Sequence, residues 1–529
     1  MIKRLFFILI VTPVLMGCNR QIHDFNITSF GAKADGTTVN TIYIQQAIDA
    51  CYQNGGGRVV IPPGQFVSGT IILKSNVNLY LEQGARLIGS LDTADYWIDG
   101  QKHGIIYAYQ ATGITISGEG EIDGRGTRFH IADRAHIGQD FIRSATRQGE
   151  QYLLPDPVPQ DGPISYNVRP GMMVLFLQCE QVAIKNVTFR DSPEWTFRIA
   201  DCDDVIVSGI SIHNNLLVPN SDGIHCTTSR NVRISDCDIR AGDDAIIVTG
   251  FGTQAGVNGD VITKLDYTTR DYGNKTGYAE NVTVTNCLLQ SKSAGIRVGY
   301  GINPIRNCVF SNLVIYDSNR GLGLFSRDDG SIENILFSDI TIQNRLHSGH
   351  WWGNGEPIHV SAVRQDPDLP AGPIKNIRFR NIIAESESGI LIYGTDESPI
   401  SDLLLDNVSI KISAGEKSES YGGNFDLRPV YKKDLGIFKH DIPALYSRHT
   451  EGLQITDFSV SWDENVPQFM SNAIYCTEFI NLTIDGFYGT PANPGHTAIE
   501  LVNGKGAVVQ NLTSADKNLK LLLSREVKF

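Results

Sequence analysis

The sequence has little positive charge for its length. Its 529 residues include 45 Lys and Arg against 58 Asp and Glu, which gives a formal net charge of -13. Binding to a phosphate backbone needs a basic surface, so this balance argues against nucleic acid as a partner. Beyond the first eighteen residues, the sequence also lacks an apolar run of membrane-spanning length. We therefore expect a chain that is soluble apart from any lipid anchor.

The first eighteen residues, MIKRLFFILIVTPVLMGC, have the features of an export signal. Lys3 and Arg4 precede an apolar run that is too short to remain as a membrane-spanning helix. The run ends in LMGC, which resembles a bacterial lipobox. The resemblance implies that residues 1–18 form a lipoprotein signal peptide, that Cys18 is lipidated, and that the mature chain is anchored to the outer membrane, facing either the periplasm or the exterior. The alternative is an ordinary cleaved signal with a chance cysteine.

A nine-residue pattern recurs along the chain from residue 181 onward. QVAIKNVTF begins at residue 181, NVTVTNCLL at 281 and NIRFRNIIA at 376. In each copy apolar and polar residues alternate, then Asn, Asp or Gly interrupts the run before a second short alternation, as strand–bend–strand requires. The copies are about 25 residues apart, or about twice that, which is the spacing of a solenoid repeat. One such unit cannot bury its apolar face alone, whereas stacked units share a core.

The repeat therefore predicts an all-β fold, a single-stranded right-handed parallel β-helix that forms one catalytic domain over residues 19–529. Residues 40–55 predict a helix that caps the open end of the stack, beginning at Asn40 or Thr41 and stopping at Gly55. The apolar face of this helix would consist of Ile44, Ala47, Ile48 and Cys51.

Three other features follow from the repeat. Cys237 and Cys287 occupy the same place in two copies, which favours stacked core thiols, although export permits disulfides. Residues 125–170 and 250–278 are rich in turn formers and lack the pattern. We expect both segments to be long loops, which on solenoids often form the walls of a binding groove.

Three acids stand in two glycine-containing turns, NSDGIHC at residues 220–226 and AGDDAII at 241–247. Asp222 and Asp243 are separated by about one coil, and adjacent coils lie about 4.8 Å apart, so we expect the two side chains to be neighbours. Gly242 would provide a turn that brings Asp244 to the same groove. Clustered carboxylates raise at least one pKa, leaving a general acid beside ionised bases, as glycosidic bond hydrolysis requires. The alternative is that these are solvated turn acids.

At these residues the chain resembles glycoside hydrolase family 28, the polygalacturonases and rhamnogalacturonan hydrolases. Asn220-Ser221-Asp222-Gly223 matches the family's Asn-Thr-Asp-Gly motif, and Gly242-Asp243-Asp244 matches Gly-Asp-Asp. The resemblance implies a right-handed parallel β-helix, Asp243 as general acid, and Asp222 and Asp244 as the groups that activate water for attack with inversion. Inversion would place the carboxyls about 6.5–9.5 Å apart. It implies no cofactor and no metal.

The chain also departs from the family pattern. Ala294 stands where the family has a histidine, and Gly323 and Phe325 replace the arginine and lysine of its uronate-binding motif. Either Arg297 and Arg327 take over that role, or the sugar in the cleavage subsite is neutral, because an unpaired carboxylate among three aspartates would be repelled.

A loop at residues 345–362, RLHSGHWWGNGEPIHVSA, is a candidate wall for the substrate because indole rings pack against the apolar faces of sugars. The alternative is that its Trp pair packs beneath the loop. Its histidine spacing matches no zinc motif. We expect one of its histidines, or His225, to complete the site. The candidate substrate-binding residues are Asn220, His225, Arg297, Tyr300, Arg327, His350, Trp351, Trp352, Glu356 and His359.

The sequence therefore predicts an inverting glycoside hydrolase that cleaves a pectin-like or related plant or algal glycan, in exo mode at chain ends. A polysaccharide lyase on the same fold is a second hypothesis, but it would need calcium-binding acids and a basic proton abstractor. A non-catalytic glycan-binding β-helix is a third, favoured by the missing histidine. We expect a monomer whose partner is the glycan substrate.

Overall fold

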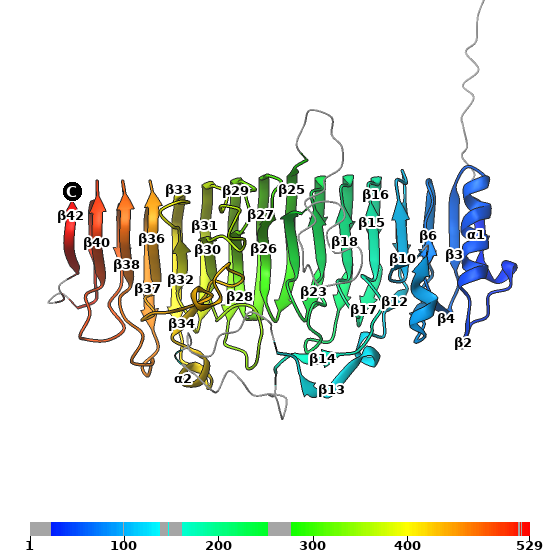
Figure 1. Cartoon of the computed structure of the whole chain (residues 1–529), viewed down its shortest axis with the longest axis horizontal. Helices are drawn as coiled ribbons and strands as arrows, with labels where there is room; N and C mark the ends of the chain where they lie inside the picture. Colours follow the sequence, from blue (N-terminus) through cyan, green and yellow to red (C-terminus); the bar gives the residue numbers. More distant parts are fainter. Residues whose placement is uncertain are drawn as a thin grey trace, which may run out of the picture.

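A computed structural model describes residues 23–98, 100–137, 147, 161–251, 277–516, 519 and 521–529. The predicted signal peptide with Cys18, and most of the predicted loop at 250–278, lie outside these residues. Thirty-six of the described strands join in one ladder of parallel pairs, and Figure 1 shows them stacked along the long axis of the molecule. A strand connected to its parallel neighbour in this way coils to the right. The predicted right-handed parallel β-helix is confirmed.

The strands fall into three stacks, because each turn of the chain adds a strand to the strand of the turn before. The first stack begins with β1 (Asp24–Asn26), β3 (Gly57–Ile61), β6 (Val77–Leu81), β11 (Thr115–Gly118), β16 (Glu180–Lys185), β19 (Asp203–Ser208) and β22 (Arg230–Ser235). The second begins with β2 (Asp35–Val39), β4 (Gly64–Ser68), β7 (Ala85–Gly89), β12 (Glu121–Asp123), β17 (Thr188–Arg190), β20 (Ser211–His213) and β23 (Asp238–Ala241).

From β25 onward, one strand per turn continues these first two stacks. These strands are β25 (Ala279–Ser291), β27 (Ile305–Ser318), β29 (Ile332–Asn344), β31 (Ile374–Ser386), β33 (Ile400–Ile412), β37 (Gln454–Trp462), β39 (Thr483–Tyr488) and β41 (Val508–Thr513). The third stack is β5 (Ile71–Ile72), β10 (Ile106–Tyr109), β15 (Val174–Leu177), β18 (Phe197–Ala200), β21 (Ile224–Thr227), β24 (Ile246–Gly250), β26 (Ala294–Gly301), β28 (Arg320–Ser326), β30 (Ile358–Ala362), β32 (Ile390–Tyr393), β36 (Leu445–Glu451), β38 (Ile474–Ile480), β40 (Ile499–Lys505) and β42 (Leu522–Lys528).

The bend in each repeat is made by a residue with a left-handed backbone. Asn286, Asn381 and Asn407 have φ between 53° and 54°, a region that asparagine tolerates better than most residues. Their side chains also bond from coil to coil. The Asn407 amide donates to Asn381 Oδ1 at 3.0 Å, and Asn381 donates to Asp339 Oδ1 at 2.9 Å. The interrupting Asn and Asp residues of the sequence pattern are therefore the corners of the coil.

The core consists of similar side-chain contacts that are repeated from coil to coil along the axis. Phe310, Phe337 and Phe379 stack with ring centroids 4.8 and 5.0 Å apart, close to the spacing of adjacent strands. In the described part of the chain all eight cysteines are buried thiols outside any disulfide. Cys237 lies beside Cys287, because the residues that follow them pair in register. The prediction of core thiols in place of disulfides is confirmed for these residues.

Helix α1 (Thr41–Gln53) covers one end of the stack, opposite β42 (Figure 1). Its buried residues are Ile44, Ala47, Ile48 and Cys51, as predicted. The expected capping role of Asn40 is wrong: this residue precedes the helix, but its side chain accepts from Lys33 N–H at 2.7 Å and donates to Thr38 O at 2.7 Å. The side chain secures the preceding turn, so it makes no capping bond to the helix.

Several elements lie outside the three stacks. They are η1 (Ile27–Phe30), η2 (Thr93–Tyr96), β8 (Trp97–Ile98), β9 (Gln101–Lys102), η3 (Gly126–Phe129), β13 (His130–Ala135), β14 (Ile164–Tyr166), α2 (Ser418–Tyr421), β34 (Asn424–Asp426), η6 (Lys433–Leu435) and β35 (Ile437–Lys439). The predicted loop at 125–170 thus contains an antiparallel pair, β13 with β14. Within the described residues, no helix has the length and apolar character needed to cross a membrane.

Candidate active site

The three acids lie in the turns that precede two adjacent strands of the third stack. Asp222 stands before β21, and Asp243 and Asp244 stand before β24, which pairs with β21 in register. One carboxylate oxygen of each residue lies within 4.8 Å of the other two. Their exposed fractions are only 2%, 5% and 5%. The structure thus brings the three acids together as their spacing predicts, and they are not solvated turn residues.

Two glycines permit this close approach. A Cβ on Gly242 would lie 2.2 Å from the carbonyl oxygen of Val218, and a Cβ on Gly223 would lie 2.2 Å from that of Ala245. The nearest oxygens of the three carboxyls lie within 4.8 Å of one another, and the separation of about 6.5–9.5 Å between carboxyl groups that inversion requires stays a prediction. Stacking of adjacent coils, together with the turn at Gly242, produces the close approach of these oxygens.

Backbone amides fix the orientation of two of the acids. Asp243 accepts from the N–H of Asp244 at 2.9 Å and from the N–H of Asn220 at 3.3 Å. Asp244 accepts from the N–H of Ala294 at 2.9 Å and from Nε of Arg297. In contrast, Oδ1 of Asp222 is buried and has no hydrogen-bond partner among the described residues. Ala294, at the position where the family has a histidine, thus contributes its backbone N–H to the site.

Burial and mutual repulsion shift the protonation of the cluster. Burial raises the pKa of Asp222 well above its usual range, and the carboxylates of Asp243 and Asp244 raise it further. Burial, followed by the charge of Asp244, raises the pKa of Asp243 to about 7, although Arg297 opposes this shift. An aspartate that holds its proton near neutral pH can act as a general acid.

Arg297 supplies the positive charge of the cluster. Its guanidinium lies 4.6 Å from the centre of the Tyr300 ring, and both residues come from β26. Within the described part of the chain, its Nη1 is buried without a hydrogen-bond partner. A cation could in principle use the three carboxylates, but the guanidinium already pairs with Asp244 and would repel a divalent ion. The cluster therefore fits acid–base chemistry better than metal binding.

The acids open into a pocket of about 110 Å³. It is lined by Trp195, Asn220, Asp222, Asp243, Asp244, Ser293, Arg297, Tyr300, Arg320, Trp352 and Pro429. Of the predicted substrate-binding residues, four belong to this lining: Asn220, Arg297, Tyr300 and Trp352. We call this space the cleavage pocket.

The other predicted substrate-binding residues do not line the cleavage pocket. Arg327 is fully buried and donates to the carbonyl oxygens of Ser361 and Leu427 at 3.1 and 2.9 Å, so it supports the backbone. Trp351 is buried, and its Nε1 donates to Asp161 O at 2.7 Å. The alternative that a tryptophan packs beneath the loop is thus correct for Trp351, whereas its neighbour Trp352 reaches the pocket.

The histidines and Glu356 are likewise used elsewhere. His225 is fully buried behind the pocket, with its ring 3.9 Å from that of Trp195 and Nε2 3.2 Å from Thr249 Oγ1. His359 is fully buried beside Glu356, which accepts from the Asp426 N–H at 3.0 Å. His350 is also buried and outside the lining. No described histidine is among the residues that line the cleavage pocket, and the expectation that an imidazole completes the site stays a prediction.

An arginine that sequence reasoning missed takes part instead. Arg320 of β28 pairs in register with Ala294 of β26, so it lies one coil beyond the position of the missing histidine. Its Nε is 3.5 Å from Glu356, too loose for a hydrogen bond, and this buried atom has no partner in the part of the chain described. In the sequence, the separation of one coil between Ala294 and Arg320 was the signal that could have identified this arginine. Trp195, in the phrase DSPEWTF, and Ser293 and Pro429 were also missed.

The fold and the carboxylate cluster together define the class of this protein. It is a parallel β-helix that carries, at the turns of one stack, the acid–base groups of a glycoside hydrolase.

Comparison with known proteins identifies the family. The model for glycosyl hydrolases family 28 matches residues 165–426, which contain all three acids. A second model, rhamnogalacturonase A/epimerase, pectate lyase-like, matches residues 25–117. The chain belongs to glycosyl hydrolases family 28 and is a glycosyl hydrolase.

Three relatives illustrate the similarity. A probable polygalacturonase from Vitis vinifera is 23% identical over 422 residues, covering 75% of this chain and 76% of the relative. An exo-poly-alpha-D-galacturonosidase from Dickeya chrysanthemi is 31% identical over 263 residues, covering 44% and 42%. The solved family 28 exopolygalacturonase of Yersinia enterocolitica has a TM-score of 0.60 at 18% identity, covering 88% and 78%, and supports the fold.

Proposed function

We propose that this hydrolase cleaves a pectic glycan built from galacturonate residues, releasing sugars from the chain end. The observation that carries the proposal is the cluster of three buried carboxylates in which Asp243 has a pKa of about 7. The names of two similar proteins, an exo-poly-alpha-D-galacturonosidase and an exopolygalacturonase, support both the sugar and the exo mode.

In the proposed mechanism, Asp243 donates its proton to the glycosidic oxygen as the bond to the anomeric carbon breaks. Water attacks that carbon from the opposite face and gives its proton to Asp244, whose carboxylate pairs with Arg297. The leaving sugar gains a hydroxyl and the other sugar gains the water oxygen. Because the water attacks from the face opposite the broken bond, the anomeric configuration is inverted.

Two arginine donors support recognition of a uronate. Arg297 and Arg320 both line the cleavage pocket, and Arg297 Nη1 and Arg320 Nε are buried without hydrogen-bond partners among the residues described. Below their raised pKa values, Asp222 and Asp243 are protonated, which leaves the charge of Asp244 balanced by Arg297. A substrate carboxylate then meets little net repulsion. The two donors thus replace the arginine and lysine missing at Gly323 and Phe325.

The test is product analysis with polygalacturonate and a neutral galactan as substrates. We expect new reducing ends from polygalacturonate alone, monomeric galacturonate as the first product, and inverted configuration in early proton spectra. A product that absorbs in the ultraviolet would support a lyase. Saturable binding without any cleavage would support a glycan-binding protein, and cleavage of galactan alone would refute uronate recognition.

We also propose that Cys18 carries a lipid that anchors the enzyme to the outer membrane as a monomer. The support is the sequence LMGC after an apolar run, residues that lie outside the described structure. Full-length protein should fractionate with membranes, and Cys18→Ser should not incorporate a radiolabelled fatty acid. If the parent protein fractionates as soluble material, the anchor is refuted.

A further inference from the structure

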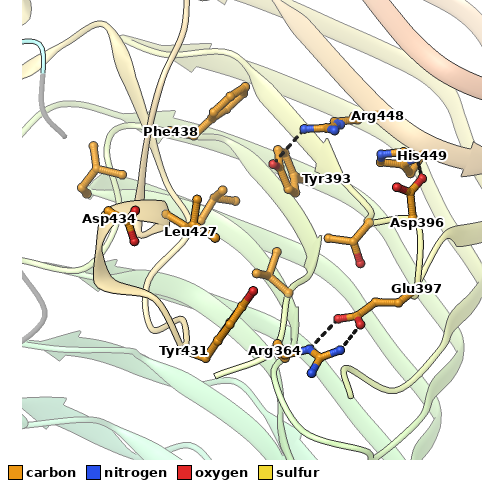
Figure 2. A pocket seen from close by; sticks show the side chains of 14 residues that line it. Arg364, Tyr393, Asp396, Glu397, Leu427, Tyr431, Asp434, Phe438, Arg448 and His449 are labelled. Atoms are coloured by element: carbon orange, nitrogen blue, oxygen red, sulfur yellow. Dashed lines mark hydrogen bonds and ion pairs between the residues drawn. The ribbon is translucent and has the colours of Figure 1, made fainter. Parts of the chain in front are cut away.

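A second cavity, of about 390 Å³, lies further along the same stack of strands (Figure 2). Tyr393 of β32 and Arg448 of β36 are adjacent in register and form part of its wall. Leu427, Tyr431 and Phe438 border it from the segment that contains η6 and β35. We call it the distal cavity.

The distal cavity is aligned with the cleavage pocket along the coil axis. Gly299, next to Tyr300 of the cleavage pocket, is in line with Tyr393 through three successive in-register strand pairings. Three steps of about 4.8 Å place Tyr393 roughly 14 Å further along the axis. One segment borders both spaces, because Pro429 lines the cleavage pocket while Leu427 and Tyr431 line the distal cavity. A glycan several sugars long could therefore occupy both.

Aromatic side chains give the distal cavity an apolar surface. The ring of Phe438 meets that of Tyr393 edge-on, with centroids 5.3 Å apart. Tyr431 is 37% exposed, and the guanidinium of Arg364 lies 5.6 Å from the centre of its ring. The apolar C–H face of a sugar ring packs well against aromatic rings of this kind, while their hydroxyls stay available to water or ligand.

The charges around the distal cavity are matched by partners. Nε of Arg364 donates to Glu397 at 2.7 Å. Nε of Arg448 donates to Glu478 at 2.7 Å, and its Nη1 donates to the Tyr393 hydroxyl at 3.2 Å (Figure 2). Nδ1 of His449 lies 3.2 Å from Asp396. Two arginines thus face acids, and the exposed Asp434 adds a negative charge to the lining.

This balance distinguishes the distal cavity from the cleavage pocket. Among the described residues that line it, acids outnumber arginines, so no arginine is in excess for a substrate carboxylate. The paired ionic groups and a tyrosine hydroxyl still have directions open to sugar hydroxyls. We propose that the distal cavity binds a neutral sugar residue of the glycan whose other end enters the cleavage pocket. The link to cleavage rests on the proposed function, but binding of the neutral sugar does not.

Binding is measured first in the Asp243→Asn protein, titrated calorimetrically with galactotetraose, arabinotetraose and tetragalacturonate. We expect saturable binding of at least one neutral tetrasaccharide. Addition of Tyr431→Ala should weaken that binding about tenfold, because the aromatic face is lost, and should leave tetragalacturonate binding unchanged. Tyr488→Ala is the matched control, since Tyr488 is 54% exposed on β39 and belongs to neither lining.

Hydrolysis is measured second, with the Asp243 side chain intact. Tyr431→Ala should raise KM for a pectin with neutral side chains about tenfold and leave KM for short galacturonides unchanged. The inference is overturned if no neutral tetrasaccharide binds, if Tyr431→Ala and Tyr488→Ala behave alike, or if Tyr431→Ala weakens only tetragalacturonate. If Tyr431-dependent neutral binding persists in a protein that hydrolyses nothing, the proposed function fails and this inference stands.

Discussion

Two arginine–aspartate pairs join neighbouring coils of this molecule in very different surroundings. Arg380 of β31 and Asp406 of β33 pair on the outside of the solenoid at 2.8 Å, with side chains 55% and 26% exposed. Arg297 and Asp244 pair at the cleavage pocket, with side chains only 8% and 6% exposed. Each pair links two adjacent coils. Arg380 and Asp406 are direct register partners, whereas Asp244 lies in the turn before β24 and Arg297 is in register with Ile247.

The difference between the two pairs lies in the dielectric environment and the neighbouring charges. Water and salt screen an exposed pair, whose contribution to stability is about 0–1 kcal/mol. A buried pair interacts strongly with every other charge nearby. Asp244 therefore raises the pKa of Asp243, while Arg297 limits that rise. An arginine–aspartate pair is thus a surface contact on one face of the coil, whereas on another face it shifts the pKa of Asp243, the proposed general acid.

Asp243→Asn should give the largest effect. Without a proton to donate, the variant should lose about 10²–10⁴ in kcat on polygalacturonate, while substrate binding survives. The measurement is initial reducing-end release together with calorimetric binding. Asp406→Asn, the exposed counterpart, should change kcat less than about twofold. Equal activity of the two variants would show that burial does not distinguish the aspartates in function.

Arg297→Gln should cause the next largest effect, on stability. It leaves Asp244 buried without its cation, which costs about 3–5 kcal/mol of unfolding free energy at neutral pH, against about 0–1 kcal/mol for Arg380→Gln. Denaturant unfolding at neutral pH measures it. Equal losses in the two variants would contradict the contrast between the pairs.

The coil could be predicted from the sequence because the residues that determine it lie close together in the chain. Alternation of apolar and polar residues defines each strand, and an asparagine such as Asn381 marks the corner with its left-handed backbone. The acids could be predicted for a related reason. One coil separates Asp222 from Asp243, so a regular repeat converts sequence distance directly into spatial contact.

The wall of the site could not be predicted in that way. The carbonyl oxygen of Leu427 accepts a hydrogen bond from Arg327, and the N–H of Asp426 donates one to Glu356. The segment around residues 426–427, far away in the sequence, therefore determines which of these side chains are buried. No periodicity relates that segment to the loop at 345–362. Composition alone gave Trp351 and Trp352 the same role, whereas tertiary contacts bury the first and direct the second to the cleavage pocket.

Arg320→Lys should have a smaller, selective effect. Lysine keeps the positive charge beside Glu356 and Asp426 but lacks the planar guanidinium, whose Nε has no hydrogen-bond partner among the described residues. KM for galacturonide substrates should rise about tenfold with little change in kcat. Arg380→Lys on the outer face should leave KM unchanged. A fall in kcat with constant KM would assign Arg320 to the chemical step instead of to uronate binding.

The smallest effect should be the pH dependence of stability in Asp243→Asn. The raised pKa of Asp243 means that the folded protein keeps a proton which the unfolded chain releases at about pH 4. Its contribution to stability is therefore complete below that pH and is lost as the pH rises through about 7. Asparagine cannot ionise, so the variant avoids this loss. Its unfolding temperature should match that of the parent near pH 4 and exceed it by a few degrees at pH 8.

Asp406→Asn, the control on the outer face, should show no such gain in unfolding temperature. If Asp243→Asn is instead less stable at pH 8, the buried carboxylate is compensated in the folded state, and the contrast between the buried and the exposed pair would no longer explain how Asp243 holds its proton.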